Sequence, residues 1–218
     1  MVKNIIFDLD GTILNTLGDL QYNINLSLHD YGFDATYSKE EIKSLIGSGS
    51  RIAIKRALKP FSVTDAEINE VYHHYSKLYE LSHVERSVIY PGVLKLLTAL
   101  KADGYHLFCL TNKPHDIAVD VINHFFPNLF EDVIGQMEGQ PVKPDPKLLG
   151  VLVKRNNIDL EKTMYVGDSD VDILTATNGK IPMVYVSWGF RTPAEVAHLK
   201  FTYQANTAEE LENIIRNH

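Results

Sequence analysis

Acidic and basic side chains with distinctive spacings stand at four separate places in this chain. Two segments are acidic, Asp8-Leu-Asp-Gly-Thr12 and Gly167-Asp-Ser-Asp-Val-Asp172. Two others, Thr111-Asn-Lys-Pro114 and Lys143-Pro-Asp-Pro146, supply hydroxyl, amide and ammonium groups. Carboxylates can hold a hard divalent cation, and a lysine beside them can bind an oxyanion. The residue types therefore predict chemistry on a phosphate-like group.

The carboxylates need a positive partner if they lie close together. If a helix starts near Asp168, Asp168 and Asp172 share one face, which costs about 0.2 to 0.5 kcal/mol even on an exposed helix. Asp8 and Asp10 at a neighbouring strand end add to the repulsion. Oxygen ligands fit Mg²⁺, and the absence of Cys or His beside these carboxylates disfavours zinc.

The other two segments predict an anion site. Placing Pro114 at the first helical position leaves Thr111 and Asn112 at a helix amino terminus, where backbone N–H groups favour negative charge. Lys143 precedes Pro144, which favours an extended conformation, and its ammonium suits a phosphate oxygen. A divalent ion facing such a group describes a phosphoryl-transfer site.

The elements that position these segments alternate along the chain. Short apolar runs at 4–8, 106–111, 163–167 and 182–187, with a weaker one at 131–135, predict buried strands. Helical patterns follow Pro91, Pro114 and Pro146. This order predicts an α/β fold with a Rossmann-like parallel sheet, which binds ligands at the carboxyl ends of its strands.

A helical insertion interrupts this alternation. Leu17, Leu20, Ile24 and Leu28 fall on one helical face, and two capping boxes begin at Ser38 and Thr64. We therefore predict a core domain formed by residues 1–14 and 88–218, and a smaller helical cap domain at 15–87.

Composition excludes several classes of protein. The chain has 218 residues and a formal net charge of −7, and it has no run of Lys or Arg that could follow a nucleic-acid backbone. No window of 18 apolar residues could span a membrane, and the amino terminus lacks the apolar region of a signal peptide. With a single cysteine, Cys109, the sequence predicts a cytoplasmic protein.

Taken in order, the four motifs resemble those of the haloacid dehalogenase (HAD) superfamily, within it the phosphatases whose helical cap follows the first strand. The matching residues are Asp8, Asp10 with Gly11 and Thr12, then Thr111, Lys143, Asp168 and Asp172. The resemblance covers the whole α/β part and implies a HAD-like core.

The resemblance also implies a role for each matching residue. Asp8 would be the nucleophile that forms an aspartyl-phosphate, and Asp10 the general acid and then the general base. Asp8, the backbone carbonyl of Asp10, and Asp168 would hold Mg²⁺, with Asp172 supporting this metal site. Thr111 and Lys143 would bind the transferring phosphoryl group. Asn15 departs from the acidic residue often found after the first motif, and Asp170 is a weaker ligand candidate.

Substrate selection is expected to involve the cap. Gly47, Ser48 and Arg51 lie in the segment Gly47-Ser-Gly-Ser-Arg51, where backbone can approach a ligand and the arginine can bind a carboxylate or a second phosphate. An interhelical turn with an exposed arginine is the structural alternative. Thr12 and Asn112 are the core candidates for substrate contact, although the Thr12 hydroxyl can equally cap its turn.

The sequence thus predicts a Mg²⁺-dependent phosphatase for a small phosphorylated metabolite, acting as a monomer or homodimer. Trp188-Gly-Phe-Arg191 and Thr111-Asn-Lys-Pro114 are similar to segments of phosphoglycolate phosphatases. Three alternatives share the motifs: a phosphotransferase similar to β-phosphoglucomutase, an inorganic pyrophosphatase of the same fold, and a catalytically silent phosphate-binding module.

Overall fold

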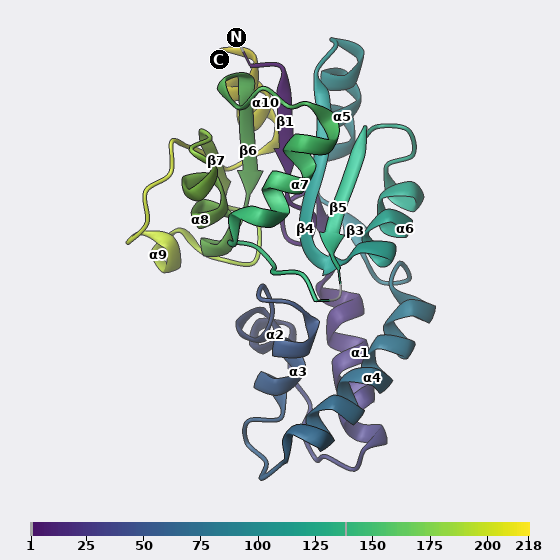
Figure 1. Ribbon diagram of the computed structural model, residues 1–218. Helices are drawn as coiled ribbons and strands as arrows, with labels where there is room; N and C mark the ends of the chain where they lie inside the picture. Colours follow the sequence, from purple (N-terminus) through teal and green to yellow (C-terminus); the bar gives the residue numbers. More distant parts are fainter. Residues whose placement is uncertain (1, 138) are drawn as a thin grey trace. The chain divides into compact units, whose positions relative to one another are not determined.

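The computed structural model describes residues 2–137 and 139–218, which form two compact units. The first contains residues 1–15 and 89–218, and the second contains residues 16–88. Figure 1 shows the first unit as a sheet with flanking helices and the second as a group of helices.

A six-stranded sheet in which neighbouring strands run parallel forms the centre of the first unit, in the order β5-β4-β1-β6-β7-β8. The strands are β1 (Asn4–Phe7), β4 (His106–Pro114), β5 (Asp132–Gln136), β6 (Thr163–Gly167), β7 (Met183–Val186) and β8 (Tyr203–Ala205). The central strands β1 and β6 are buried throughout, as expected for a parallel sheet covered on both faces. The predicted α/β fold class is confirmed.

Helices cover both faces of this sheet. They are α5 (Val93–Ala102), α6 (His115–Phe125), α7 (Pro146–Asn156), α8 (Asp170–Gly179), α9 (Pro193–Val196) and α10 (Ala208–Arg216), with a 3-10 turn at Leu160–Lys162. On one face Ile6, Phe108 and Tyr165 pack in one apolar cluster with Leu149 of α7 and Ile173 of α8. Alternation along β1 turns Ile5 and Phe7 to the opposite face.

The second unit is built from four helices, α1 (Leu17–Asp30), α2 (Lys39–Leu45), α3 (Ser50–Ala57) and α4 (Asp65–Ser82). Both predicted capping boxes are present, with Ser38 paired to Glu41 and Thr64 paired to Glu67. The short strands β2 (Leu14–Asn15) and β3 (Val88–Ile89) pair where the chain passes between the units. Within the described part of the chain, no helix is both long enough and apolar enough to cross a bilayer.

Two details of the strand ends differ from the sequence prediction. Strand β4 continues to Pro114 and α6 begins at His115, so Thr111 and Asn112 lie in extended backbone and not at a helix amino terminus. Helix α8 begins at Asp170 after the N-cap Ser169, which places Asp168 outside the helix. At the first position β4 continues past the predicted helix start, and at the second the Ser169 capping box with Asp172 sets the start of α8.

Candidate active site

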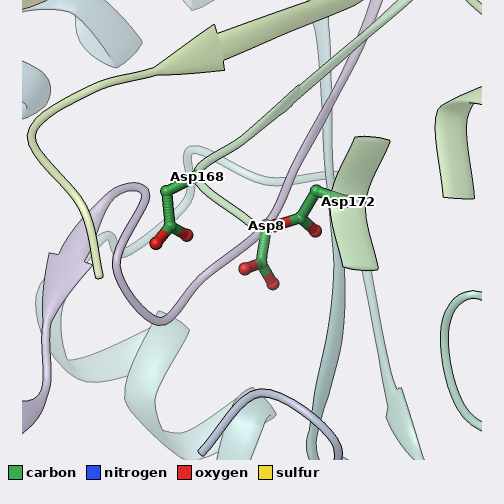
Figure 2. Close-up of side chains that lie close together, drawn as sticks. All are labelled: Asp8, Asp168 and Asp172. Atoms are coloured by element: carbon green, nitrogen blue, oxygen red, sulfur yellow. The ribbon is translucent and has the colours of Figure 1, made fainter. Parts of the chain in front are cut away.

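Three carboxylates meet at the carboxyl ends of β1 and β6. Asp8 follows β1, Asp168 follows β6, and Asp172 lies in the first turn of α8. Because β1 and β6 are parallel neighbours, their carboxyl ends meet at the same edge of the sheet. One oxygen of each carboxylate lies within 4.8 Å of the others, and Figure 2 shows Asp8 between Asp168 and Asp172.

Lys143 is the cation of this cluster. Its ammonium lies 2.8 Å from Asp8 Oδ1 and 2.8 Å from Asp172 Oδ1, and the residue is 3% exposed. The two carboxylates hold the pKa of Lys143 well above its usual value despite the opposing effect of burial. The ammonium is therefore fixed in its charged form beside Asp8.

One ammonium does not balance three buried carboxylates. Burial and then the charge of Asp172 raise the pKa of Asp8, against the opposing effect of Lys143. The pKa of Asp168 is raised to about 7, again by burial and then by Asp172. Uncompensated negative charge in a buried site favours either protons or a bound cation.

Asp168 is held in place by two loops, one after β1 and one after β7. The Thr12 hydroxyl donates to Asp168 Oδ1 at 3.0 Å, and the Phe190 backbone N–H donates to Oδ2 at 2.7 Å. A Cβ atom at Gly11 or at Gly189 would overlap this carboxylate. These glycines let two backbone segments close around Asp168. The predicted substrate contact of Thr12 stays a prediction, since its hydroxyl is bonded to Asp168 here.

Asp172 is bound through both of its oxygens. Ser169 donates to Oδ2 through its backbone N–H at 3.1 Å and its hydroxyl at 2.6 Å, forming the N-terminal capping box of α8. Lys143 and the Tyr165 hydroxyl meet Oδ1. Asp168 and Asp172 are thus brought together by the strand-to-helix loop and not by a shared helical face. Asp170 is the weaker ligand candidate, and its Oδ1 lies 3.7 Å from Arg191 Nε.

The carboxyl-terminal end of β4 contributes Asn112 and Lys113 to the site. The Asn112 carboxamide donates to Lys143 O at 3.0 Å and accepts from Lys143 N at 2.7 Å, so it fixes the backbone of the lysine. Lys113 donates to Asp10 Oδ1 at 2.7 Å. We did not single out Lys113 from the sequence, although its place inside the motif Thr111-Asn-Lys-Pro114 was an available signal. Thr111 is buried, and its hydroxyl accepts from Lys113 N at 3.2 Å.

Residues 5–186 match the family described as haloacid dehalogenase-like hydrolase. The chain belongs to this family.

Relatives within this hydrolase family extend over nearly the whole chain. A phosphoglycolate phosphatase of Vibrio cholerae is 30% identical over 203 residues, which cover 90% of this chain and 89% of the relative. A phosphoglycolate phosphatase of Colwellia psychrerythraea is 32% identical over 192 residues, with 85% and 84% covered. A crystal structure from Lactobacillus delbrueckii subsp. bulgaricus is 31% identical, covers 98% of both chains, and has a TM-score of 0.91. These similarities indicate a phosphoric monoester hydrolase.

The loop after β7 also contacts the candidate site. Trp188 Nε1 donates to Thr12 O at 2.9 Å, and the Trp188 ring packs against Tyr90. The Trp188 contact ties this loop to the turn that carries Asp8 and Asp10. The loop thereby supports the first acidic motif while its Phe190 N–H binds Asp168.

The oxygen donors of the cluster fit a divalent cation. Asp8 and Asp168 present carboxylate oxygens within reach of one ion, and neither Cys nor His belongs to the group. Hard cations such as Mg²⁺ prefer such ligands. The excess of carboxylates over ammonium groups also favours a bound divalent cation.

In the cap unit, the candidate substrate residues lie in and beside one loop. Gly47 adopts a φ of 107°, Ser48 accepts a hydrogen bond from Arg56 Nη2 at 3.1 Å, and Arg51 donates to Asn69 Oδ1 at 3.0 and 2.8 Å. Arg56 also donates to Leu45 O at 2.9 Å, so it organises this loop from within the cap. We did not single out Arg56 from the sequence, because a cation near the end of a helix usually indicates only a favourable helix terminus. The roles of Gly47, Ser48 and Arg51 in substrate binding stay predictions.

Proposed function

We propose that this protein is a Mg²⁺-dependent phosphatase that hydrolyses a small phosphorylated acid, of the phosphoglycolate type, through an aspartyl-phosphate on Asp8. One observation carries the proposal: a buried ammonium lies 2.8 Å from Asp8 in a cluster that still has an excess of carboxylates. Such a site suits a nucleophilic carboxylate, a divalent cation and a phosphoryl group.

Asp8 begins the reaction by attacking phosphorus. One Asp8 oxygen forms the new O–P bond as the bond between phosphorus and the ester oxygen breaks, and the electron pair leaves with that oxygen. Asp8, Asp168 and the Asp10 backbone carbonyl would hold Mg²⁺, which when bound neutralises charge on the phosphoryl oxygens. Lys143 and Thr111 bind the phosphoryl group, and Lys143 also limits the repulsion between Asp8 and that group.

Asp10 is the general acid of the first half-reaction and the general base of the second. Its side chain is 22% exposed, so it can meet both a leaving group and water. Asp10 donates a proton to the departing ester oxygen. It then takes a proton from the water that attacks phosphorus, as the bond between phosphorus and the Asp8 oxygen breaks, phosphate leaves and the Asp8 carboxylate is regenerated. Lys113 holds the Asp10 carboxylate through its 2.7 Å contact.

The relatives and the candidate cations support this substrate class. Both quoted sequence relatives are phosphoglycolate phosphatases. A small phosphorylated acid carries a second anionic group, for which Arg51 is the cap candidate. A screen of phosphorylated metabolites with Mg²⁺, scored by kcat/KM, tests this class. The screen includes pyrophosphate and a hexose 1-phosphate, and preference for either would replace our assignment.

Asp8→Asn tests the nucleophile directly. We expect release of phosphate from p-nitrophenyl phosphate to fall at least about 10⁴-fold, because an amide oxygen is a far weaker nucleophile than a carboxylate. The melting temperature should stay at or above that of the wild type, because the change removes one charge from a repulsive buried group. Asp120→Asn, on the exposed face of α6, is the control. Wild-type turnover in Asp8→Asn would rule out the aspartyl-phosphate.

A further inference from the structure

The hydroxyl of Tyr165 lies in the active site, yet the proposed mechanism gives it no part. Tyr165 is in the middle of β6 and is completely buried. Its hydroxyl oxygen lies 3.0 Å from Lys143 Nζ, 3.1 Å from Asp172 Oδ1 and 3.4 Å from Leu110 O. In the sequence this tyrosine was part of an apolar strand, so its hydroxyl gave no signal. The folded chain places that hydroxyl against the lysine that faces Asp8.

The hydrogen bonds of the ammonium can be accounted for one by one. A lysine ammonium can donate three hydrogen bonds and can accept none. Its three acceptors are Asp8 Oδ1 at 2.8 Å, Asp172 Oδ1 at 2.8 Å and the Tyr165 hydroxyl at 3.0 Å. Because the tyrosine oxygen accepts from Lys143, its own proton is directed to Asp172 Oδ1 or to Leu110 O. Each proton of the ammonium thus has a separate protein acceptor.

Two of these acceptors belong to groups that are themselves firmly held. Asp172 is bound at its other oxygen by the Ser169 N–H and hydroxyl, and Tyr165 lies within the central sheet. The lysine is also fixed at its backbone, by both hydrogen bonds of the Asn112 carboxamide. The third acceptor is the carboxylate of Asp8, the proposed nucleophile for phosphoryl transfer.

We propose that Tyr165 is a positioning residue, which together with Asp172 aims one N–H of Lys143 at the transferring phosphoryl group. Two N–H groups stay on Tyr165 and Asp172. The third, on Asp8 in this structure, passes to a phosphoryl oxygen as the Asp8–phosphorus bond forms. This inference rests on the proposed phosphatase function, and it adds a residue that acts through Lys143 without touching the substrate.

Tyr165→Phe removes the hydroxyl and keeps the ring. The ammonium then lacks one fixed acceptor and reorients, so its alignment on the phosphoryl group is lost where charge is greatest, in the transition state. We expect kcat to fall at least about tenfold with KM within about threefold of the wild type. Orthovanadate, which resembles the transition state, should bind at least about tenfold more weakly, whereas the inhibition constant of inorganic phosphate should change less than about threefold.

Tyr37→Phe is the matched control. The Tyr37 hydroxyl donates to the backbone carbonyl of Ala57 at 2.7 Å, within the cap unit. This variant loses the same atom and one hydrogen bond, and its kinetic constants should match those of the wild type. Thermal melts of both variants, read by circular dichroism, show whether Tyr165→Phe remains folded at the assay temperature.

The possible outcomes separate the positioning role from the proposed function. Weaker vanadate binding with lower kcat, in a folded protein, supports the positioning role. Kinetic constants and vanadate affinity within threefold of the wild type overturn it, and so does a kcat loss accompanied by partial unfolding at the assay temperature. If the wild type neither hydrolyses p-nitrophenyl phosphate nor binds vanadate with Mg²⁺, the proposed function itself fails.

Discussion

Among the residues that the structure describes, the cap buries one carboxylate and the core buries three, and the two units satisfy them differently. In the cap, Asp19 is fully buried and accepts from the Arg86 backbone N–H at 2.8 Å and the Ser87 hydroxyl at 2.5 Å. The Arg86 guanidinium lies 3.8 Å away. In the core, one oxygen each of Asp8, Asp168 and Asp172 lie within 4.8 Å of one another, and Lys143 pairs with Asp8 and Asp172.

The difference lies in how fully the charge of each buried carboxylate is compensated. Asp19 is a single charge surrounded by neutral donors and one cation, and its bonds secure the segment that leads out of the cap. The core cluster retains an excess of negative charge, and burial together with the charge of Asp172 raises the pKa of both Asp8 and Asp168. Burial of a single acid therefore does not indicate a functional site. A cluster of acids whose negative charge is only partly compensated does indicate one.

Removing the core cation tests this contrast most severely. We expect Lys143→Ala to lower kcat/KM by about 10²- to 10³-fold, because it removes the charge that faces both Asp8 and the phosphoryl group. Lys147→Ala, an exposed lysine at the start of α7, should leave the kinetics unchanged. A loss below about tenfold, or about 1.4 kcal/mol, would show that Lys143 is peripheral.

The packing around Asp168 is the next most sensitive feature. A Cβ at Gly189 would overlap the Asp168 carboxylate, so Gly189→Ala should displace this ligand and weaken Mg²⁺ activation by about 10- to 100-fold. The measurement is the Mg²⁺ concentration needed for half-maximal activity. Gly150→Ala, in α7 with open space around it, should leave that concentration unchanged. Equal behaviour of the two variants would contradict the structure of this loop.

For the cap carboxylate we expect a loss of stability and not of chemistry. Asp19→Asn replaces one accepting oxygen with an NH₂ group that faces donors, which should lower the free energy of unfolding by about 1 to 3 kcal/mol. Urea unfolding of the variant, compared with the exposed Asp34→Asn, measures this loss. An unchanged unfolding free energy would mean that the Arg86 and Ser87 bonds do not stabilise the cap.

The smallest effect is a pH dependence of the metal-free protein. The pKa of Asp168 is about 7 in the folded chain against an ordinary value of 3.8. Between these two values the folded state holds more protons than the unfolded state, so the contribution of this group to stability falls as the pH rises from about 4 to about 7. With EDTA present, the melting temperature of the wild type should decline across this range more than that of Asp168→Asn.

Mg²⁺ should reverse that decline at pH 7 and above, because the ionised Asp168 then gains a cation. Thermal melts with and without Mg²⁺ measure the reversal. If Mg²⁺ gave the same increase in melting temperature in Asp168→Asn, Asp168 would not be a ligand.

The sequence by itself determined the alternation of strands and helices and the two capping boxes, because each depends on local periodicity or on neighbouring residues. It also indicated that acids and a lysine would lie at strand ends, and the parallel sheet brings Asp8, Lys143, Asp168 and Asp172 together there. The catalytic and binding roles of these residues remain predictions. Local signals placed helix starts less well, as Asp168 and Pro114 show, because the Ser169 capping box and the continuation of β4 decide where α8 and α6 begin.

Only the tertiary structure decided which partner each polar group meets. Tyr165 and Lys143 are 22 positions apart, Lys113 and Asp10 are 103 apart, and Asn112 reaches the Lys143 backbone across 31 positions. Strand periodicity predicts that a tyrosine is buried, but it does not predict what the tyrosine hydroxyl contacts. That contact depends on the register between strands and on the path of a loop, which no short segment of sequence contains.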